Sequence, residues 1–291
     1  MSATIQYSSE KLTIPKLLEK KIQKETITCL TAYDYPFARI LDEAGIDILL
    51  VGDSLGMTRL GYESTLPVTL AEIMVHLRAV RRAVRRALLV ADMPYGSYHV
   101  GAKSAVKNAL RFIKEGGAEA VKIEGGRKRC RLVERLVEAE IPVMGHIGLT
   151  PQSVHFMGGY KVQGKTPQTA EALLEDALIL QESGAFSVVL EGIPQEVAGK
   201  ITRELRIPTI GIGAGIHCDG QILVTDDLLG LSFSPKPKFV RQYANLKETI
   251  SSAVRKFMGE SRTGSFPGRE ESYHLIADPA SKVLVKHGAG R

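Results

Sequence analysis

The sequence predicts an α/β fold, a closed (β/α)8 barrel, on three observations. Short runs rich in Val, Ile and Leu alternate with helix-like segments, as in proteins with a parallel sheet. There are eight such runs, the number found in this barrel. The 291 residues, of which 44% are hydrophobic, can also bury one large core. An open, doubly wound sheet would show a similar alternation and remains the alternative architecture.

The eight expected strands follow one another at intervals that leave room for a helix between most of them. They are Ile27–Leu30, Ile46–Val51, Ala87–Ala91, Ala120–Ile123, Pro142–Ile147, Phe186–Leu190, Pro208–Ile212 and Gln221–Val224.

Helix boundaries are marked by capping residues. Thr69 and Glu72 form a capping-box pattern before apolar residues at helical spacing, so a helix should begin there. Glycines suited to the left-handed conformation should end three other helices, and Pro194 suits the first turn of a further one. These glycines are Gly45, Gly116 with Gly117, and Gly184.

We expect one main domain, residues 1–258, which includes a leading helix over Ile14–Lys20. Residues 259–291 mix Gly, Pro, Ser and charged residues, a composition typical of a loosely ordered tail.

The bulk composition narrows the class of protein. The difference between 38 basic and 32 acidic residues gives a net charge of +6, which favours anionic partners, small carboxylic acids as much as nucleic acid. No stretch resembles a signal peptide or the roughly 20 apolar residues of a membrane span, so a cytoplasmic protein is expected. Cys29, Cys130 and Cys218 lack CxxC spacing, which argues for reduced thiols rather than disulfides or a cysteine metal site.

Polar residues stand at or just after the ends of five expected strands. A buried parallel strand should be apolar, and the carboxyl ends of the strands form the active site in (β/α)8 enzymes. We therefore expect these side chains to meet at one mouth. They are Asp53 and Ser54, Asp92, Lys122 and Glu124, His146, and Glu191.

The acidic members of this set suggest a site for a hard cation such as Mg²⁺, which prefers oxygen ligands. Asp53, Asp92 and Glu124 are the candidate ligands. Asp53 or Asp92 alone is more simply explained as a cap of the following helix or turn. Lys122 and Glu124, two residues apart, should face the same side of their strand. A purely structural ion pair is the alternative for them, at the cost of burying both charges.

Two further candidates have competing explanations. Glu191 could be a general base, or a charge that complements the dipole of the following helix. His146 is more simply a satisfied core histidine than a catalytic one.

Two basic or glycine-rich segments have simpler explanations. Gly211–Gly215 lacks the full GxGxxG spacing of a dinucleotide site, which favours a tight turn over a phosphate-binding loop. The arginines between Arg78 and Arg86 lie opposite the apolar stripe of their helix and suggest a solvated face or a subunit contact.

From about residue 12 to residue 258 the chain resembles the ketopantoate hydroxymethyltransferase family, because several long motifs occur in family order. These motifs are Leu30-Thr-Ala-Tyr-Asp34, Val51-Gly-Asp-Ser-Leu-Gly-Met57, Ser64-Thr-Leu-Pro-Val-Thr69, Val121-Lys-Ile-Glu-Gly-Gly126, Gly145-His-Ile-Gly-Leu-Thr-Pro-Gln-Ser153, Gly158-Gly-Tyr-Lys-Val-Gln-Gly164, Gly211-Ile-Gly-Ala-Gly215 and Asp219-Gly-Gln-Ile-Leu223. Ile216–Cys218 and the extension beyond about His274 look less typical.

The resemblance implies a phosphoenolpyruvate/pyruvate-type barrel that acts in pantothenate biosynthesis in the cytoplasm, commonly as a homodecamer built as a pentamer of dimers. By motif, Asp53, Asp92 and Glu124 match the magnesium ligands, and Asp53, Ser54, Asp92 and Lys122 match the positions that bind the 2-oxo acid. Glu191 matches the proposed proton acceptor. The implied reaction uses 5,10-methylenetetrahydrofolate and a magnesium-stabilised enolate.

Two rival functions remain. One is another magnesium-dependent C–C lyase or mutase of the same barrel group, which would not depend on folate. The other is a polyanion-binding barrel that uses the Arg78–Arg86 face, and the lack of interleaved aromatic residues argues against it. Neither nucleic acid nor a membrane is an expected partner.

Overall fold

The computed structural model describes residues 10–233 and 235–275 and shows a closed barrel of eight parallel strands in the order β1 to β8. Strand β1 pairs with both β2 and β8, which closes the sheet and excludes the open alternative. All eight predicted runs form strands, and each predicted end lies within two residues of the observed one. The strands are β1 (Ile27–Thr31), β2 (Ile48–Val51), β3 (Leu88–Asp92), β4 (Ala120–Glu124), β5 (Val143–Gly148), β6 (Ser187–Glu191), β7 (Thr209–Ile212) and β8 (Gly220–Leu223).

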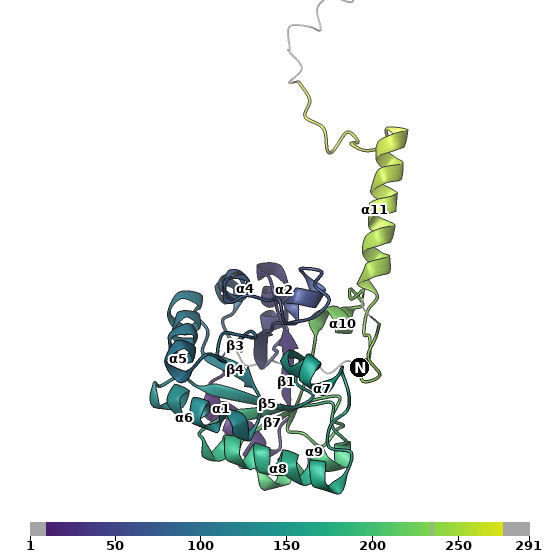
Figure 1. Ribbon diagram of the computed structural model, residues 1–291. Helices are drawn as coiled ribbons and strands as arrows, with labels where there is room; N and C mark the ends of the chain where they lie inside the picture. Colours follow the sequence, from purple (N-terminus) through teal and green to yellow (C-terminus); the bar gives the residue numbers. More distant parts are fainter. Residues whose placement is uncertain (1–9, 234, 276–291) are drawn as a thin grey trace, which may run out of the picture. The chain divides into compact units, whose positions relative to one another are not determined.

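Helices surround the strands, as Figure 1 shows for α4, α5, α6, α8 and α9. The α-helices are α1 (Ile14–Gln23), α2 (Tyr35–Glu43), α3 (Leu55–Thr58), α4 (Leu70–Ala83), α5 (Ala102–Arg111), α6 (Cys130–Glu138), α7 (Val154–Met157), α8 (Pro167–Glu182), α9 (Gln195–Glu204), α10 (Thr225–Leu229) and α11 (Leu246–Thr263). Shorter helical segments are η1 (Phe112–Gly116), η2 (Arg127–Arg129) and η3 (Pro151–Ser153).

The predicted helix boundaries largely agree with the structure. The leading helix is α1, and Thr69 and Glu72 form a capping box at the start of α4. Gly45 and Gly184 take positive φ values of 90° and 95° just after α2 and α8. Pro194 differs slightly, because it is the N-cap of α9 and stands one residue before its first turn.

Two apolar layers follow from the alternation of side chains along the strands. Leu49 and Val51 pack between the sheet and the helices, whereas Ile48 and Leu50 belong to the cluster inside the barrel.

The same alternation places the polar residues. Val90 and Ala120 belong to the inner cluster, so Asp92, Lys122 and Glu124, at even spacings from them, also point into the barrel. The alternation of side chains along the strands therefore points these charges into the barrel, at the carboxyl-terminal ends of the strands.

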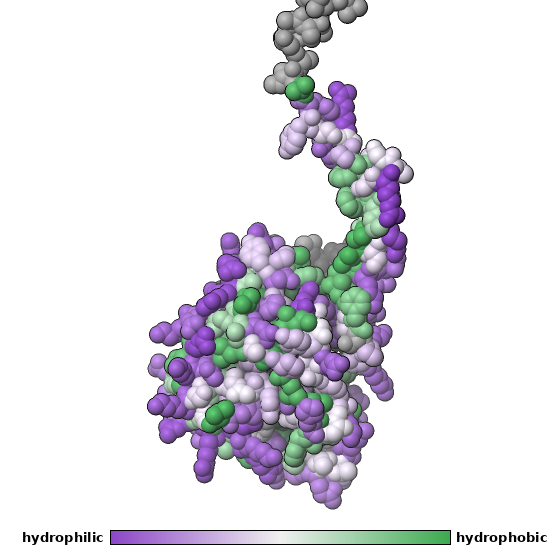
Figure 2. Space-filling view, turned by 45° about the horizontal axis from the view of Figure 1, so that its top comes forward, coloured by the Kyte–Doolittle hydropathy of each residue, from purple (hydrophilic) through white to green (hydrophobic). Residues whose placement is uncertain are grey.

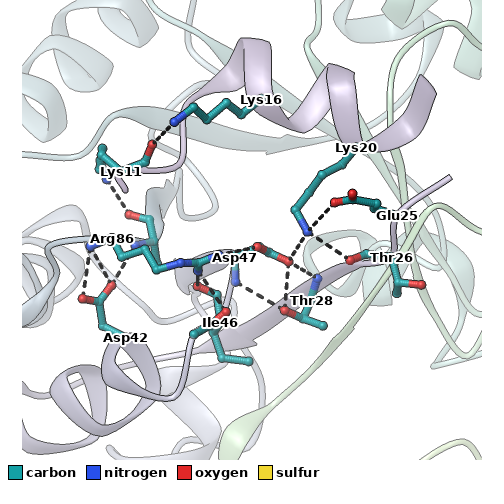
Figure 3. A network of polar contacts seen from close by, with 12 residues as sticks. Lys11, Lys16, Lys20, Glu25, Thr26, Thr28, Asp42, Ile46, Asp47 and Arg86 are labelled. Atoms are coloured by element: carbon teal, nitrogen blue, oxygen red, sulfur yellow. Dashed lines mark hydrogen bonds and ion pairs between the residues drawn. The ribbon is translucent and has the colours of Figure 1, made fainter. Parts of the chain in front are cut away.

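The opposite end of the barrel is held by a polar network, which Figure 3 shows. The Asp42 carboxylate accepts hydrogen bonds from the backbone N–H groups of Arg85, Arg86 and Ala87, just before β3. The Arg86 guanidinium donates to the carbonyl of Ile46 and pairs with Asp47 at 3.0 Å. In TIM barrels this end serves stability, while the opposite end carries the chemistry.

This network corrects one expectation about the arginine run. Arg86 lies inside the protein's own network, and its side chain is only 14% exposed. Arg78 forms an exposed ion pair with Glu115, and Arg82 and Arg85 are also exposed. Arg86 is therefore not part of a solvated cationic face. The face of the barrel that Figure 2 shows is largely hydrophilic, with scattered apolar residues.

The chain divides into two compact units, Met1–Ala244 and Asn245–Arg291. Helix α11 belongs to the second and runs to Thr263, so residues 259–263 are helical and not tail, contrary to expectation. The predicted domain boundary after residue 258 falls within this helix, and residues 276–291 of the expected tail lie outside the described residues. No helix in the described chain is long and apolar enough to cross a membrane.

Candidate active site

Three charged side chains from β3 and β4 form the centre of the site. Lys122 Nζ lies 2.7 Å from Asp92 Oδ1 and 4.0 Å from Glu124 Oε1. All three residues are at most 5% exposed. Strands β3 and β4 pair with each other, and in their register Asp92 stands opposite Lys122. The register of the sheet therefore brings these charges together.

Asp53 and Ser54 enter from the loop after β2. The backbone N–H of Asp53 donates to Asp92 Oδ2 at 3.2 Å, and Ser54 Oγ lies 2.7 Å from the Tyr33 hydroxyl. Neither aspartate side chain caps a helix: Asp53 Oδ2 accepts from Gln152, and α3 begins after Ser54 without a side-chain cap bond. The geometry therefore favours the site over the capping alternative.

His146 of β5 and Glu191 of β6 lie beside this charged centre. His146 Nδ1 lies 3.4 Å from Glu124 Oε1, and its Nε2 lies 3.2 Å from Glu191 Oε2. His146 is buried, as a core histidine would be, but its neighbours place it inside the site. The Glu191 side chain is 15% exposed, so it is the more accessible of the two.

Burial and mutual repulsion set the charge states of the centre. Burial raises the pKa of Asp53 well above its usual value, and the nearby carboxylates of Asp92 and Glu124 raise it further. Burial lowers the pKa of Lys122, but Asp92 and Glu124 outweigh that effect and the net shift is upward. Lys122 is therefore an ammonium ion at neutral pH.

His146 is also charged in this arrangement. Burial and the charge of Lys122 lower its pKa, whereas contacts with Glu124 and Glu191 raise it, and the result is about 9. An imidazolium at neutral pH would hold both carboxylates in place and donate a proton rather than accept one.

The carboxylates of the centre are candidate ligands for a divalent cation. Within residues 10–233 and 235–275, no three His, Cys, Asp or Glu side chains form a ready-made metal-binding group. Lys122 stands between Asp92 and Glu124 instead. Mg²⁺, however, is usually held by one or two carboxylates together with waters and substrate oxygens. Asp53 and Asp92, linked through the Asp53 backbone, fit that requirement. Glu124 belongs to the same group of charges, and the mutual repulsion of the three carboxylates is of the kind that a cation relieves.

Two residues of the site were missed in the sequence. Gln152, in η3 after β5, donates from its side chain to Asp53 Oδ2 at 2.8 Å and from its backbone to Glu124 Oε2 at 3.0 Å. Tyr98 donates its hydroxyl proton to Gln152 Oε1 at 2.7 Å. Both are nearly fully buried. The signal available in the sequence for Gln152 was its place in the family motif that runs from Gly145 to Ser153.

The glycine-rich segment Gly211–Gly215 begins in β7 and bends just beyond it. Gly213 and Gly215 have φ values of 59° and 78°. A Cβ on Gly215 would lie 2.2 Å from the Gln195 side chain, so close packing explains this glycine without a bound phosphate.

Comparison with known proteins identifies the family. A family model described as ketopantoate hydroxymethyltransferase matches residues 11–269. The chain belongs to the ketopantoate hydroxymethyltransferase family. It is 63% identical over 265 residues to a 3-methyl-2-oxobutanoate hydroxymethyltransferase of Koribacter versatilis, with 91% of this chain and 90% of that protein covered.

Solved structures show the same fold at low sequence identity. A putative phosphonomutase from Burkholderia cenocepacia has a TM-score of 0.63 at 13% identity, covering 83% of this chain and 98% of that one. A 2,3-dimethylmalate lyase, of the PEP mutase/isocitrate lyase superfamily, has a TM-score of 0.56 at 16% identity and covers 90% of this chain and 89% of that one. These likenesses show that the chain shares the barrel fold of these proteins.

Proposed function

We propose that the protein transfers a hydroxymethyl group from 5,10-methylenetetrahydrofolate to 3-methyl-2-oxobutanoate, giving 2-dehydropantoate. One observation carries the proposal: within a chain of this family, Asp53, Asp92, Lys122, Glu124 and Glu191 converge on one end of the barrel. This is the set of groups needed to bind a 2-oxo acid and remove its C3 proton.

The metal proposed for this site is Mg²⁺, held by Asp53, Asp92 and Glu124. When bound, Mg²⁺ would polarise the 2-oxo group of the substrate as a Lewis acid. The position of Lys122 supports a role for its ammonium group beside the substrate's carboxylate and enolate oxygens. Ser54, hydrogen-bonded to Tyr33, would help to hold the same oxygens.

Glu191 is proposed as the base that takes the C3 proton. Among the charged side chains of the site, its partly exposed carboxylate is the accessible proton acceptor, whereas His146 is protonated and acts as its charged neighbour. The carbon that has lost its proton would then bond to the methylene carbon of the folate, whose bond to N10 breaks. Water would replace N5 on the same carbon and leave the hydroxyl group, while the C3 proton and one proton of the water balance the two nitrogens of the departing tetrahydrofolate. No covalent bond to Lys122 is needed, and its high pKa opposes the neutral amine that a Schiff base requires.

We further propose a homodecamer, a pentamer of dimers, in the cytoplasm. One feature that suits association is the exposed apolar stripe of α11, where Ile250, Val254 and Phe257 are each at least 51% exposed (Figure 2). Exposed apolar surface of this kind is typical of protein contacts.

The proposed function is tested by assaying the purified protein for 2-dehydropantoate, with and without the folate donor and Mg²⁺. Product that depends on both supports the proposal. A product formed from the 2-oxo acid without folate would instead favour a lyase or mutase of the same barrel group. Salt-sensitive polyanion binding that survives Asp53→Asn would favour the binding-protein alternative.

A further inference from the structure

Gln152 contacts the two acidic residues that enter the site from separate elements. Its side-chain Nε2 donates to Asp53 Oδ2 at 2.8 Å and to the Met93 carbonyl at 3.0 Å. Its backbone N–H donates to Glu124 Oε2 at 3.0 Å. One residue therefore fixes one oxygen of each carboxylate.

The orientation of the Gln152 amide is determined by its neighbours. Asp53 Oδ2 and the Met93 carbonyl are acceptors, so both require the NH2 end of the amide. Tyr98 donates to Oε1 at 2.7 Å and accepts from the Glu124 backbone N–H at 3.2 Å. A reversed amide would place Oε1 against two acceptors, so only one orientation satisfies every group.

Burial makes this arrangement rigid. Gln152 and Tyr98 are 4% and 3% exposed, and the Arg129 guanidinium lies 5.1 Å from the centre of the Tyr98 ring. Among the described residues no hydrogen bond reaches Asp53 Oδ1, which leaves this oxygen for a cation.

We propose that Gln152, oriented by Tyr98, is a positioning residue that holds Asp53 and Glu124 at a fixed separation so that they serve one divalent cation. The inference rests on the proposed function, since it concerns the same metal site. Neither side chain needs to touch the substrate. Partners that orient metal ligands commonly change metal affinity or activity by about 10- to 100-fold when they are removed.

The test is calorimetric titration of Mn²⁺ into the full-length protein and its variants. Gln152→Met keeps the length of the side chain but removes the amide, and Tyr98→Phe removes only the hydroxyl that orients it. Gln181→Met is the matched control, because Gln181 is a buried glutamine whose Oε1 accepts from the Arg206 and Ile207 backbone, before β7 at the other end of the barrel. Melting temperatures are recorded for all variants.

We expect Gln152→Met to weaken Mn²⁺ binding by about 10- to 100-fold. Tyr98→Phe should weaken it less, and the double variant should resemble Gln152→Met alone because the two act as one unit. Gln181→Met should lower the melting temperature and leave Mn²⁺ affinity unchanged. If Gln152→Met does not fold, Tyr98→Phe decides the question.

Wild-type Mn²⁺ affinity in folded Gln152→Met and Tyr98→Phe would overturn the inference while leaving the metal site intact. An equal loss of affinity in Gln181→Met would also overturn it, because general destabilisation would then explain the effect. A wild-type protein that binds no Mn²⁺ would instead refute the proposed metal site, and the positioning role with it.

Discussion

Replacing Lys122 with Met should strongly destabilise the metal-free protein. Methionine matches the length of the lysine stem, so the change removes a buried charge without opening a large cavity. Lys122 and Asp92 are 5% and 2% exposed and lie 2.7 Å apart, whereas Glu124, at 4.0 Å, keeps His146 as a second cationic neighbour. The cost therefore arises chiefly at Asp92, and removing one partner of such a buried pair costs about 3–5 kcal/mol.

The loss should depend on pH in a defined direction. Burial already raises the pKa of Asp92, and Lys122 opposes that shift, so the variant should raise it further. A carboxyl whose pKa is higher in the folded state binds more protons there than when unfolded, so stability falls as pH rises from the unfolded pKa through the folded one. The destabilisation should thus be larger at pH 8 than at pH 5.

Urea unfolding in EDTA at both pH values measures this prediction, with Lys200→Met as the control. Lys200 forms an exposed ion pair with Glu171, and such pairs contribute about 0–1 kcal/mol. If Lys122→Met cost less than about 1 kcal/mol and the loss were the same at pH 5 and pH 8, the account of a buried, charged centre would be wrong.

Three other tests address separate parts of the account. Asp53→Asn and Asp92→Asn should leave the barrel folded but weaken Mg²⁺-dependent binding of the 2-oxo acid in calorimetry, and wild-type affinity in both would remove them from the metal site. Thr69→Ala should lower the free energy of unfolding by about 1 kcal/mol, because it removes the capping box of α4; an unchanged urea midpoint would contradict this. Light scattering should show an oligomer, and a monomer at working concentration would refute the proposed assembly.

The barrel was predictable because its strands are buried on both faces, so they are continuous apolar runs in the sequence. Asp92, Lys122 and Glu124 were predictable for the same reason, since charges at the end of an apolar run stand out. The apolar runs alone do not show whether the sheet is open or closed, because closure depends on the pairing of β1 with β8.

The residues that sequence reasoning missed depend on contacts between distant segments. Tyr98 and Gln152 are neutral, lie outside the strands and meet across 54 positions of the chain, so no local pattern marks them as a pair. His146 was ambiguous for a similar reason, because its role depends on Glu124 and Glu191 from the neighbouring strands. In the sequence, Arg86 belongs to the same run as its exposed neighbours. Its contacts with Asp47 and the Ile46 carbonyl arise only in the folded chain.

The most direct test of the proposed chemistry is exchange of the C3 hydrogen of 3-methyl-2-oxobutanoate for solvent deuterium, with Mg²⁺ and without folate. Removal of the C3 proton precedes attack on the one-carbon donor, so the wild-type protein should catalyse the exchange by itself. Glu191→Gln should slow it by about 10²–10⁴-fold, the usual contribution of a positioned base, while substrate affinity changes much less. If Glu191→Gln exchanged deuterium at the wild-type rate while failing to form 2-dehydropantoate, Glu191 would not be the base for this step.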